Sequence, residues 1–397
     1  MKKILLFTFI ILLLNSCSLN LKNLPIPEGT FKIGTDTFIF EDKSRLEWFT
    51  EDNENDYRRI AVQMWYPASE ISDSLHPYID NDIKLKYIAE QLDVSQKIVK
   101  GLSNVKTNSY YKSPIYNNEF PVIIFSHGLG GTKIQNSINI ENLVSFGYIV
   151  ISIDHSYDAL ITILDDKIAN FDSDPGWNAN IADFRSDPGW NTEIEEITEE
   201  EFYRVRIPQI NTRAKDVQFV IDQLYILKSQ NFYIARNCNL NKIGVFGHSF
   251  GGGTSILASH LDSRISACLN LDGWLEPIPN EIISKGLNIP FCYIGQVQKN
   301  WTTAKFNEQK LNDFHNNNSN LSYVFEIKNS EHMDYADIPY LTRLTRMFGL
   351  SGKAGKTLTK DLNFFILGFF DQTLKKQDSN WIERMNANYK TIYKSNE

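Results

Sequence analysis

The chain has 397 residues, of which 42% are hydrophobic and 22% are charged, which is typical of a folded globular protein rather than a disordered one. Its length is sufficient for one large α/β domain. The formal charge is −8, and removal of Lys2 and Lys3 with a leader leaves 38 basic and 48 acidic residues, or −10. This balance argues against nucleic acid as a partner, because phosphate binding requires a basic footprint.

The N-terminus has the features of a secretion signal. Lys2 and Lys3 precede an apolar run at 4–14, which is too short to span a bilayer comfortably and ends at Leu14-Asn15-Ser16-Cys17. Because small or aliphatic residues before a cysteine resemble a lipobox, we expect a lipoprotein signal peptide at 1–16, acylation of Cys17 and a tether at 17–29. More than one acyl chain gives stable anchoring, so we expect a lipid anchor in the membrane of a bacterial cell envelope, facing the periplasm or the cell surface. The alternative is an ordinary signal peptide with an incidental cysteine.

Three further cysteines, Cys238, Cys268 and Cys292, remain after the lipobox. An odd number outside the cytoplasm predicts no disulfide framework, and Cys268 and Cys292 lie in apolar runs typical of buried positions. No cluster of Cys and His has the spacing of metal ligands, so we expect neither a metal nor a cofactor.

From residue 30 to about 380, strand-like and helix-like segments alternate. The early strands are predicted at 31–40 and 58–66, before a helical stretch at 81–100. Short unbroken apolar runs, which are typical of central strands covered on both faces, then occur at 121–125, 148–153, 242–246, 265–271 and 290–294, with a last strand at 321–327. Helices are predicted at 213–228, 254–260 and 361–373. The pattern predicts one α/β domain at 30–380 with a mostly parallel central sheet and helices on both faces, followed by a C-terminal tail at 381–397.

One long connection, at 156–212, interrupts the alternation and shows no clear strand. It contains a tandem duplication, FDSDPGWNANIAD and then FRSDPGWNTEIEE, in which Trp177 and Trp190 follow a turn-forming Asp-Pro-Gly. One interpretation is a lid-like insertion whose tryptophans touch an apolar substrate. The other is a surface duplication that the fold tolerates.

The pentapeptide Gly247-His248-Ser249-Phe250-Gly251 matches G-x-S-x-G, between a predicted strand and a predicted helix. This context is typical of the nucleophile elbow of the α/β-hydrolase fold, in which a tight turn exposes the serine hydroxyl, so we predict Ser249 as the nucleophile. The fold orders its catalytic residues as serine, acid and histidine. Of the downstream histidines, His260 lies on the departing helix and His315 lies in a polar stretch where we expect it to be solvated. His332 follows the last strand and is therefore the predicted base.

The acid is predicted at Asp272, which ends the apolar run 265–271. The next strand end, at 295–298, offers no carboxylate, whereas Asp272 could accept the N–H of His332 and fix its tautomer. Glu308 and Asp313 remain alternatives in a polar, helix-like stretch. The oxyanion hole is predicted from the backbone N–H groups of Phe250 and of Leu129, which lies in the glycine-rich loop after the third strand of the fold.

Five motifs together resemble the plasma-type platelet-activating-factor acetylhydrolases, also called lipoprotein-associated phospholipases: FSHGLGG (125–131), RAKD (213–216), GHSFGGG (247–253), LNLDGW (269–274) and SEHMDYAD (330–337). The similarity covers about 58–373. The resemblance implies that Ser249, Asp272 and His332 form the triad and that Leu129 and Phe250 supply the oxyanion donors. It also implies a calcium-independent esterase that removes short or oxidised acyl chains from phospholipids.

The tandem tryptophan repeat and the lipobox depart from this family and concern the substrate more than the mechanism. The leading hypothesis is a serine esterase acting on short-chain or oxidised acyl esters, with polyesters, dialkyl esters or acylated glycans as alternative substrates. A non-catalytic lipoprotein that uses the fold for binding is a third hypothesis. A basic stretch after His332 is suited either to lipid phosphates or to a solvated face; it comprises Arg343, Arg346, Lys353, Lys356 and Lys360.

Overall fold

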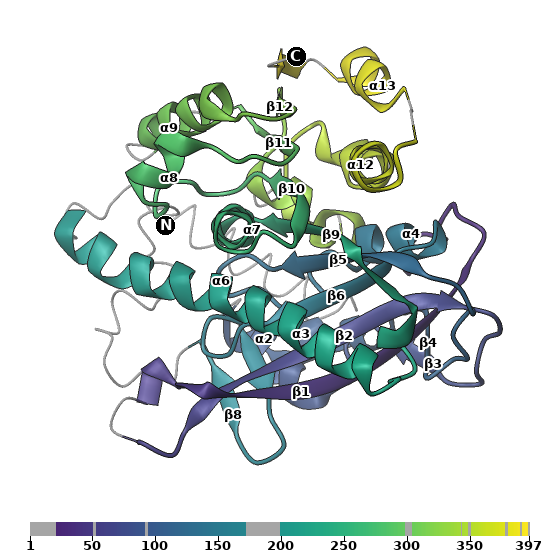
Figure 1. The fold of residues 1–397 in the computed structure, drawn as a ribbon. Helices are drawn as coiled ribbons and strands as arrows, with labels where there is room; N and C mark the ends of the chain where they lie inside the picture. The colour runs from purple at the N-terminus through teal and green to yellow at the C-terminus, as the bar shows by residue number, and fades with distance from the viewer. Residues whose placement is uncertain are drawn as a thin grey trace, which may run out of the picture.

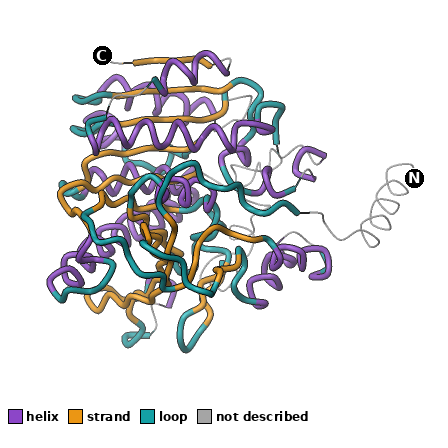
Figure 2. The backbone as a smooth tube through the Cα atoms, turned by 90° about the vertical axis from the view of Figure 1, so that its right-hand side faces the viewer, coloured by secondary structure: helices purple, strands orange, loops and turns teal. Residues whose placement is uncertain are grey.

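A computed structural model describes residues 21–50, 53–91, 94–171, 199–297, 304–342, 344–347, 351–377, 380–389 and 391–395. The described chain is built on an 11-stranded sheet with the order β13-β12-β11-β10-β9-β5-β6-β2-β1-β4-β3. Figure 1 shows this sheet with helices packed along it, and Figure 2 shows its strands as one twisted band with β13 and the C-terminus at one edge.

The centre of the sheet is parallel, as the apolar runs predict. Its strands are β5 (Phe120–Ser126), β6 (Ile149–Asp154), β9 (Cys238–His248), β10 (Ile265–Leu271), β11 (Phe291–Gln296) and β12 (Ser322–Ile327). Each parallel crossover returns the chain to the same end of the sheet, so the carboxyl ends of β9, β10, β11 and β12 meet at one edge. The residues that follow these strands therefore become neighbours.

Antiparallel pairs extend both sides of this centre. β2 (Tyr57–Ala68) pairs with β6 and with β1 (Lys32–Leu46), and β4 (Lys106–Tyr111) then pairs parallel to β1 and antiparallel to β3 (Leu75–Pro77). The sheet is thus mixed but mostly parallel at its centre, as expected. The segments at 75–77 and 106–111 are too short and polar to stand out as strands in the sequence.

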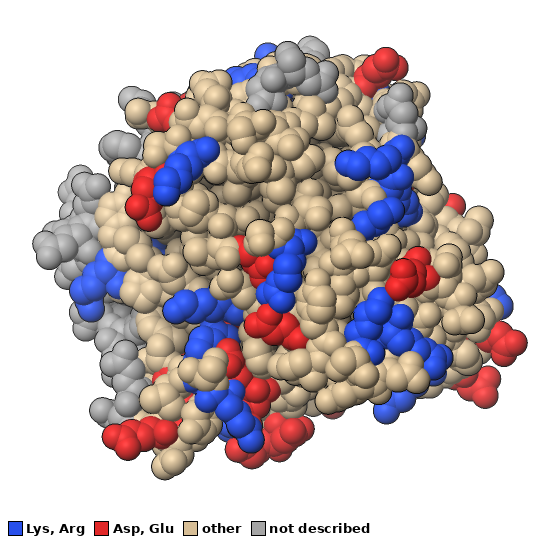
Figure 3. Space-filling model, in the orientation of Figure 1, with Lys and Arg blue, Asp and Glu red and all other residues tan. Residues whose placement is uncertain are grey.

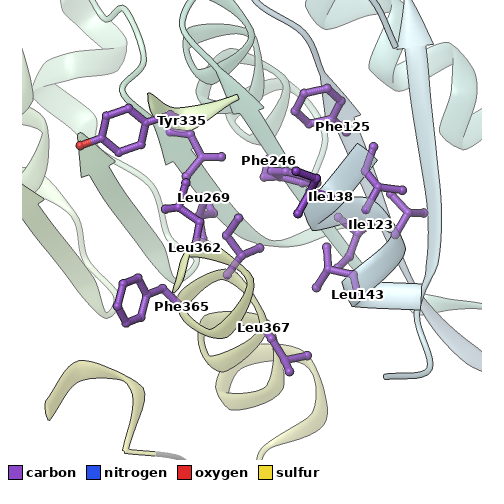
Figure 4. Close-up of a cluster of buried hydrophobic side chains, with 14 of the residues drawn as sticks. Ile123, Phe125, Ile138, Leu143, Phe246, Leu269, Tyr335, Leu362, Phe365 and Leu367 are labelled. Atoms are coloured by element: carbon purple, nitrogen blue, oxygen red, sulfur yellow. The ribbon is translucent and has the colours of Figure 1, made fainter. Parts of the chain in front are cut away.

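Successive side chains of a strand point to opposite faces, and β5 shows the consequence. Ile123 and Phe125 face α4 (Ser137–Ser145) and α12 (Gly355–Phe370), where Figure 4 shows them near Ile138 of α4 and Phe246 of β9. Val122 and Ile124 belong instead to the core on the other face. This second core is covered by α6 (Glu199–Ser229), α7 (Phe250–Leu261), α8 (Asn280–Lys285) and α9 (Ala304–Asn317).

Shorter helices complete the described chain. They are α2 (Asp82–Gln91), α3 (Gln96–Val99), α10 (Ile338–Leu341), α11 (Leu344–Met347) and α13 (Trp381–Asn388), with the short helical turns η1 (Trp48–Thr50), η2 (Lys100–Asn104), η3 (Ala235–Asn237), η4 (His332–Tyr335) and η5 (Asp371–Lys375). None of the described helices combines the length and the apolar character that a bilayer crossing requires. On the face in Figure 3, basic and acidic side chains are interspersed.

The prediction of a C-terminal tail at 381–397 is wrong in its described part. Trp381 is 1% exposed and packs against Tyr323 and Phe325 of β12, and β13 (Thr391–Ser395) pairs antiparallel with that strand. The folded unit therefore extends to the last strand, because β12 would otherwise be left with an open edge.

The connection at 156–212 is also more ordered than predicted where the structure describes it. A hairpin of β7 (Ile161–Ile163) and β8 (Ile168–Asn170) follows β6, and α6 begins at Glu199, well before the predicted start at 213. The helix continues through Pro208, which costs one backbone hydrogen bond inside it. The tandem repeat with Trp177 and Trp190 lies outside the described residues.

Candidate active site

Ser249 lies at a strained turn between β9 and α7. Its φ of 56° and ψ of −124° fall where residues other than glycine are disfavoured, and its carbonyl accepts the N–H of Trp274 at 3.1 Å. A Cβ on Gly247 would overlap the backbone of Gly251, and a Cβ on Gly251 would overlap the carbonyl of Ser126. The turn therefore requires both glycines of the pentapeptide, as in a nucleophile elbow.

Asp272 directly follows β10 and receives four hydrogen bonds. Its Oδ2 accepts from Nδ1 of His332 at 2.6 Å and from Nε2 of Gln296 at 2.9 Å, and its Oδ1 accepts from the backbone N–H of Gln296 at 2.8 Å and from the hydroxyl of Tyr293 at 3.2 Å. Its side chain is 1% exposed. The carboxylate is thus held in one orientation with one oxygen directed at the imidazole of His332.

His332 opens η4 after β12, and its side chain is 16% exposed. Its ring lies against the ring of His248, with centroids 4.5 Å apart, and its carbonyl accepts from Nε2 of His248 at 3.1 Å. Because His248 immediately precedes Ser249, the structure sets the hydrogen-bonded pair of Asp272 and His332 beside the elbow.

The glycine-rich loop after β5 lies against the elbow. A Cβ on Gly128 would lie 3.2 Å from Cβ of Ser249. The N–H groups of Gly128, Gly130 and Gly131 are engaged by acceptors within the protein, whereas that of Leu129 has no acceptor among the described residues. Phe250 is the first residue of α7, and the first N–H groups of a helix have no partner within it. Of the two predicted oxyanion donors, Phe250 thus directly follows Ser249, and Leu129 directly follows Gly128, which lies against Ser249.

Gln135 links the glycine-rich loop to His248 of the elbow, and the sequence analysis missed it. Its Oε1 accepts from the N–H of Gly128 at 2.9 Å, and its Nε2 donates to Nδ1 of His248 at 2.6 Å. Burial and the nearby His332 hold the pKa of His248 well below its ordinary value, so that its neutral ring can accept at Nδ1 and donate from Nε2. No motif marks Gln135, since its role depends on residues 113 positions away.

The RAKD motif supplies a buried scaffold behind this loop. Arg213 donates to the carbonyl of His127 and lies 5.0 Å from the ring of Phe250, while Nδ1 of His127 donates to the carbonyl of Gly128 at 2.6 Å. Nε2 of His127 accepts from the N–H of His155 at 3.2 Å. His127 therefore braces the loop.

Asp216 is the anion of this scaffold. It accepts from Arg58 at 2.6 Å and from Nδ1 of His155 at 2.9 Å, and these partners outweigh burial and lower its pKa far below the ordinary range. Burial, reinforced by the positive charge of Arg213, lowers the pKa of His155 to about 3. His155 therefore stays neutral and donates a hydrogen bond to Asp216, and the pair is not an ion pair.

The rival residues lie elsewhere. Glu308 and Asp313 are exposed on α9, and His260 lies near the end of α7. The prediction that His315 is solvated is wrong: it lies on α9, is 4% exposed, and its Nδ1 is 2.8 Å from the hydroxyl of Ser322. Cys17 lies outside the described residues.

Cys238, Cys268 and Cys292 are free and buried. Burial raises the pKa of each thiol, so the three behave as apolar side chains.

Comparisons with known proteins identify the family to which the chain belongs. The family described as "Platelet-activating factor acetylhydrolase, isoform II" matches residues 17–391. A platelet-activating factor acetylhydrolase of Canis lupus familiaris is 24% identical over 395 residues, covering 93% of this chain and 82% of the relative. A probable 1-alkyl-2-acetylglycerophosphocholine esterase of Arthroderma benhamiae is 26% identical over 274 residues, covering 64% of this chain and 59% of the relative.

A solved structure has the same fold. The ferulic acid esterase from Streptomyces cinnamoneus superposes with a TM-score of 0.71, covering 94% of this chain and 99% of its own, at 21% sequence identity. The predicted α/β-hydrolase fold is confirmed.

Proposed function

Since the chain belongs to the family of platelet-activating factor acetylhydrolase, isoform II, and is an esterase, we propose that it removes short or oxidised acyl chains from phospholipids through an acyl-Ser249 intermediate. The observation that carries this proposal is the 2.6 Å hydrogen bond between Asp272 and His332 beside the strained turn at Ser249.

In the proposed mechanism, the bond from Nδ1 of His332 to Asp272 keeps the proton on Nδ1 and leaves Nε2 as an acceptor. Nε2 takes the hydroxyl proton of Ser249 as its oxygen attacks the ester carbonyl, and Asp272 stabilises the resulting imidazolium. The imidazolium then protonates the leaving alcohol. Water, deprotonated by His332, attacks the acyl ester and restores the free hydroxyl of Ser249.

The oxyanion of each tetrahedral intermediate would bind the N–H groups of Leu129 and Phe250. Each such donor contributes about 2.7–4 kcal/mol to the transition state. Gln135 and His127 act by holding the loop that carries Leu129, since both hydrogen-bond the backbone of Gly128.

The phospholipid substrate is supported by the names of the relatives, which are acetylhydrolases and an esterase of acetylated glycerophosphocholine. Polyesters, dialkyl esters and acylated glycans remain the alternative substrate class for the same chemistry. We also propose that Cys17 carries the lipid anchor predicted from the lipobox, which would present the site to membrane lipids.

The test is a labelling and substrate experiment. A fluorophosphonate should label the protein once, at Ser249, with Ser249→Ala unlabelled. On phosphatidylcholines that differ only in their second acyl chain, acetyl and oxidised chains should be hydrolysed faster than hexadecanoyl. Labelling elsewhere would reject the nucleophile. Activity on acylated glycans without activity on any phospholipid would reject the substrate while keeping the mechanism.

A further inference from the structure

A second pocket lies apart from the elbow, in the segment that follows His332. It has a volume of about 610 Å³, within the range of small-ligand sites. It is lined by Lys22, Pro339, Tyr340, Arg346, Thr357, Lys360 and Asp361. None of these residues contributes to the candidate active site.

The pocket brings together three cations. Nζ of Lys22 lies 5.0 Å from the ring centroid of Tyr340, Nζ of Lys360 lies 5.8 Å from it, and Arg346 lines the same cavity. None of the three cations forms an ion pair with a carboxylate of the described chain.

Asp361 is the one acidic residue of the lining, and its charge is already engaged. Its carboxylate accepts the hydroxyl of Tyr389 at 2.5 Å and lies 3.8 Å from Arg384. Three like charges around one cavity repel one another, and a bound anion would relieve this repulsion.

We propose that this basic pocket binds the phosphate of an anionic phospholipid head group and so seats the protein on a membrane. Lysine and arginine are the side chains that bind phosphate oxygens, and the ring of Tyr340 supplies an apolar wall for the adjoining glycerol. Three cations would repel the trimethylammonium group of a choline head group. The pocket therefore fits an anionic lipid of the membrane and not the choline phospholipid proposed as substrate.

The position of the pocket in the chain favours a membrane lipid over a soluble phosphate. The N–H of Lys22 donates to the carbonyl of Leu341 at 3.2 Å, which fixes the start of the described chain against α10. Cys17, the proposed anchor, precedes Lys22 by five residues, which span at most about 18 Å. An anchored chain would thus hold the pocket near the lipid surface.

The net negative charge of the chain gives such a cluster of cations a role in orienting the protein. At −10 after removal of the leader, the protein as a whole is repelled by an anionic membrane, so a local cluster of cations determines which face approaches the lipid.

The experiment uses the chain from Ser18 onward, which contains every described residue but no anchor. Co-sedimentation measures its binding to vesicles of pure phosphatidylcholine and to vesicles in which part of the lipid is replaced by phosphatidylglycerol. Wild type should prefer the anionic vesicles. The triple variant Lys22→Gln, Arg346→Gln, Lys360→Gln should bind them about a hundredfold more weakly, at about fivefold per cation.

A matched triple variant controls for net charge. Lys32→Gln, Lys97→Gln and Lys285→Gln remove three exposed lysines on β1, α3 and α8, and this variant should bind nearly as well as wild type. Both triple variants should hydrolyse soluble p-nitrophenyl acetate at the wild-type rate, which shows that they are folded and separates this proposal from the esterase mechanism.

Three results would overturn the proposal. Wild type that shows no preference for phosphatidylglycerol would refute an anionic-lipid site. Equal losses in the two triple variants would attribute the binding to net charge. Unchanged vesicle binding in the pocket variant, combined with loss of its calorimetric binding of inorganic phosphate, would assign the pocket to a soluble phosphate instead.

Discussion

The substitution Asp272→Asn tests the proposed acid most sharply, because the four donors around this carboxylate predict how the amide would be oriented. An asparagine has one acceptor oxygen and one NH₂ donor, so one of the two oxygen positions must receive the donor. At the Oδ1 position the NH₂ would face the backbone nitrogen of Gln296, which lies 2.8 Å from Oδ1 in the wild type. A backbone N–H can only donate, so two donors would oppose each other there.

At the Oδ2 position both neighbours can adapt. The side-chain amide of Gln296 can turn over to present its oxygen, and His332 can move its proton from Nδ1 to Nε2. Since an opposed buried donor costs about 1–3 kcal/mol, the second orientation is favoured by roughly 5- to 150-fold. It places the proton of His332 on Nε2, where it prevents acceptance of the proton of Ser249.

We therefore expect Asp272→Asn to lower kcat by about 10⁴, or about 5.4 kcal/mol, with little change in stability. The assay is hydrolysis of p-nitrophenyl acetate, with circular dichroism to verify folding. Glu308→Gln is the control, because Glu308 is an exposed carboxylate that was considered as the acid. Turnover within tenfold of wild type in Asp272→Asn, with a large loss in Glu308→Gln, would refute the assignment.

Four further changes test other parts of the structure. Gln135→Leu should lower kcat on p-nitrophenyl acetate by about tenfold or more, with a smaller change in KM. The substitution leaves the N–H of Gly128 and Nδ1 of His248 without partners. An unchanged kcat would contradict the positioning role of Gln135. Because the pKa of His155 falls to about 3 in the fold, its stabilising contribution is complete above pH 6.5 and is lost as the pH falls toward 3, by up to about 1.4 kcal/mol per pH unit. In urea unfolding, the stability of wild type relative to His155→Gln should therefore decrease from pH 7 to pH 4, and a constant difference would show that folding leaves the pKa of His155 unchanged. Trp381→Ala should destabilise the protein by about 3–5 kcal/mol in the same assay, whereas a loss below about 0.5 kcal/mol would mean that the C-terminal segment is not part of the core. Cys17→Ser should move the full-length protein from the membrane fraction to the soluble fraction, and unchanged retention would count against acylation.

The parts of the fold that the sequence predicts well are those encoded locally. The central strands are unbroken apolar runs that need burial on both faces, and the glycines around Ser249 permit only a tight turn between a strand and a helix. Asp272 could be placed because it directly follows such a strand, and His332 because it lies in the loop just after the last strand. Because neighbouring parallel strands end at the same edge of a sheet, the residues that follow them become neighbours in space.

The features that sequence analysis missed depend on contacts between distant segments. His315 lies in a run of polar residues, yet α9 turns it toward Ser322 of β12. The segment at 391–395 shows little apolar pattern of its own and becomes a strand because it pairs with β12. Gln135 has no motif, since its two partners come from the glycine-rich loop and from the elbow.

Gln296 shows how such a contact holds the acid at the end of β10. β10 and β11 are parallel neighbours, and the N–H of Asp272 donates to the carbonyl of Ile294, so the ends of both strands lie within reach of the same imidazole. Gln296 was noted in the sequence only for its lack of charge. In the structure its backbone and side chain both donate to Asp272, which orients the carboxylate toward His332. The end of β11 therefore supplies the donors that hold the acid, and a carboxylate there would instead repel Asp272 and compete with it for His332.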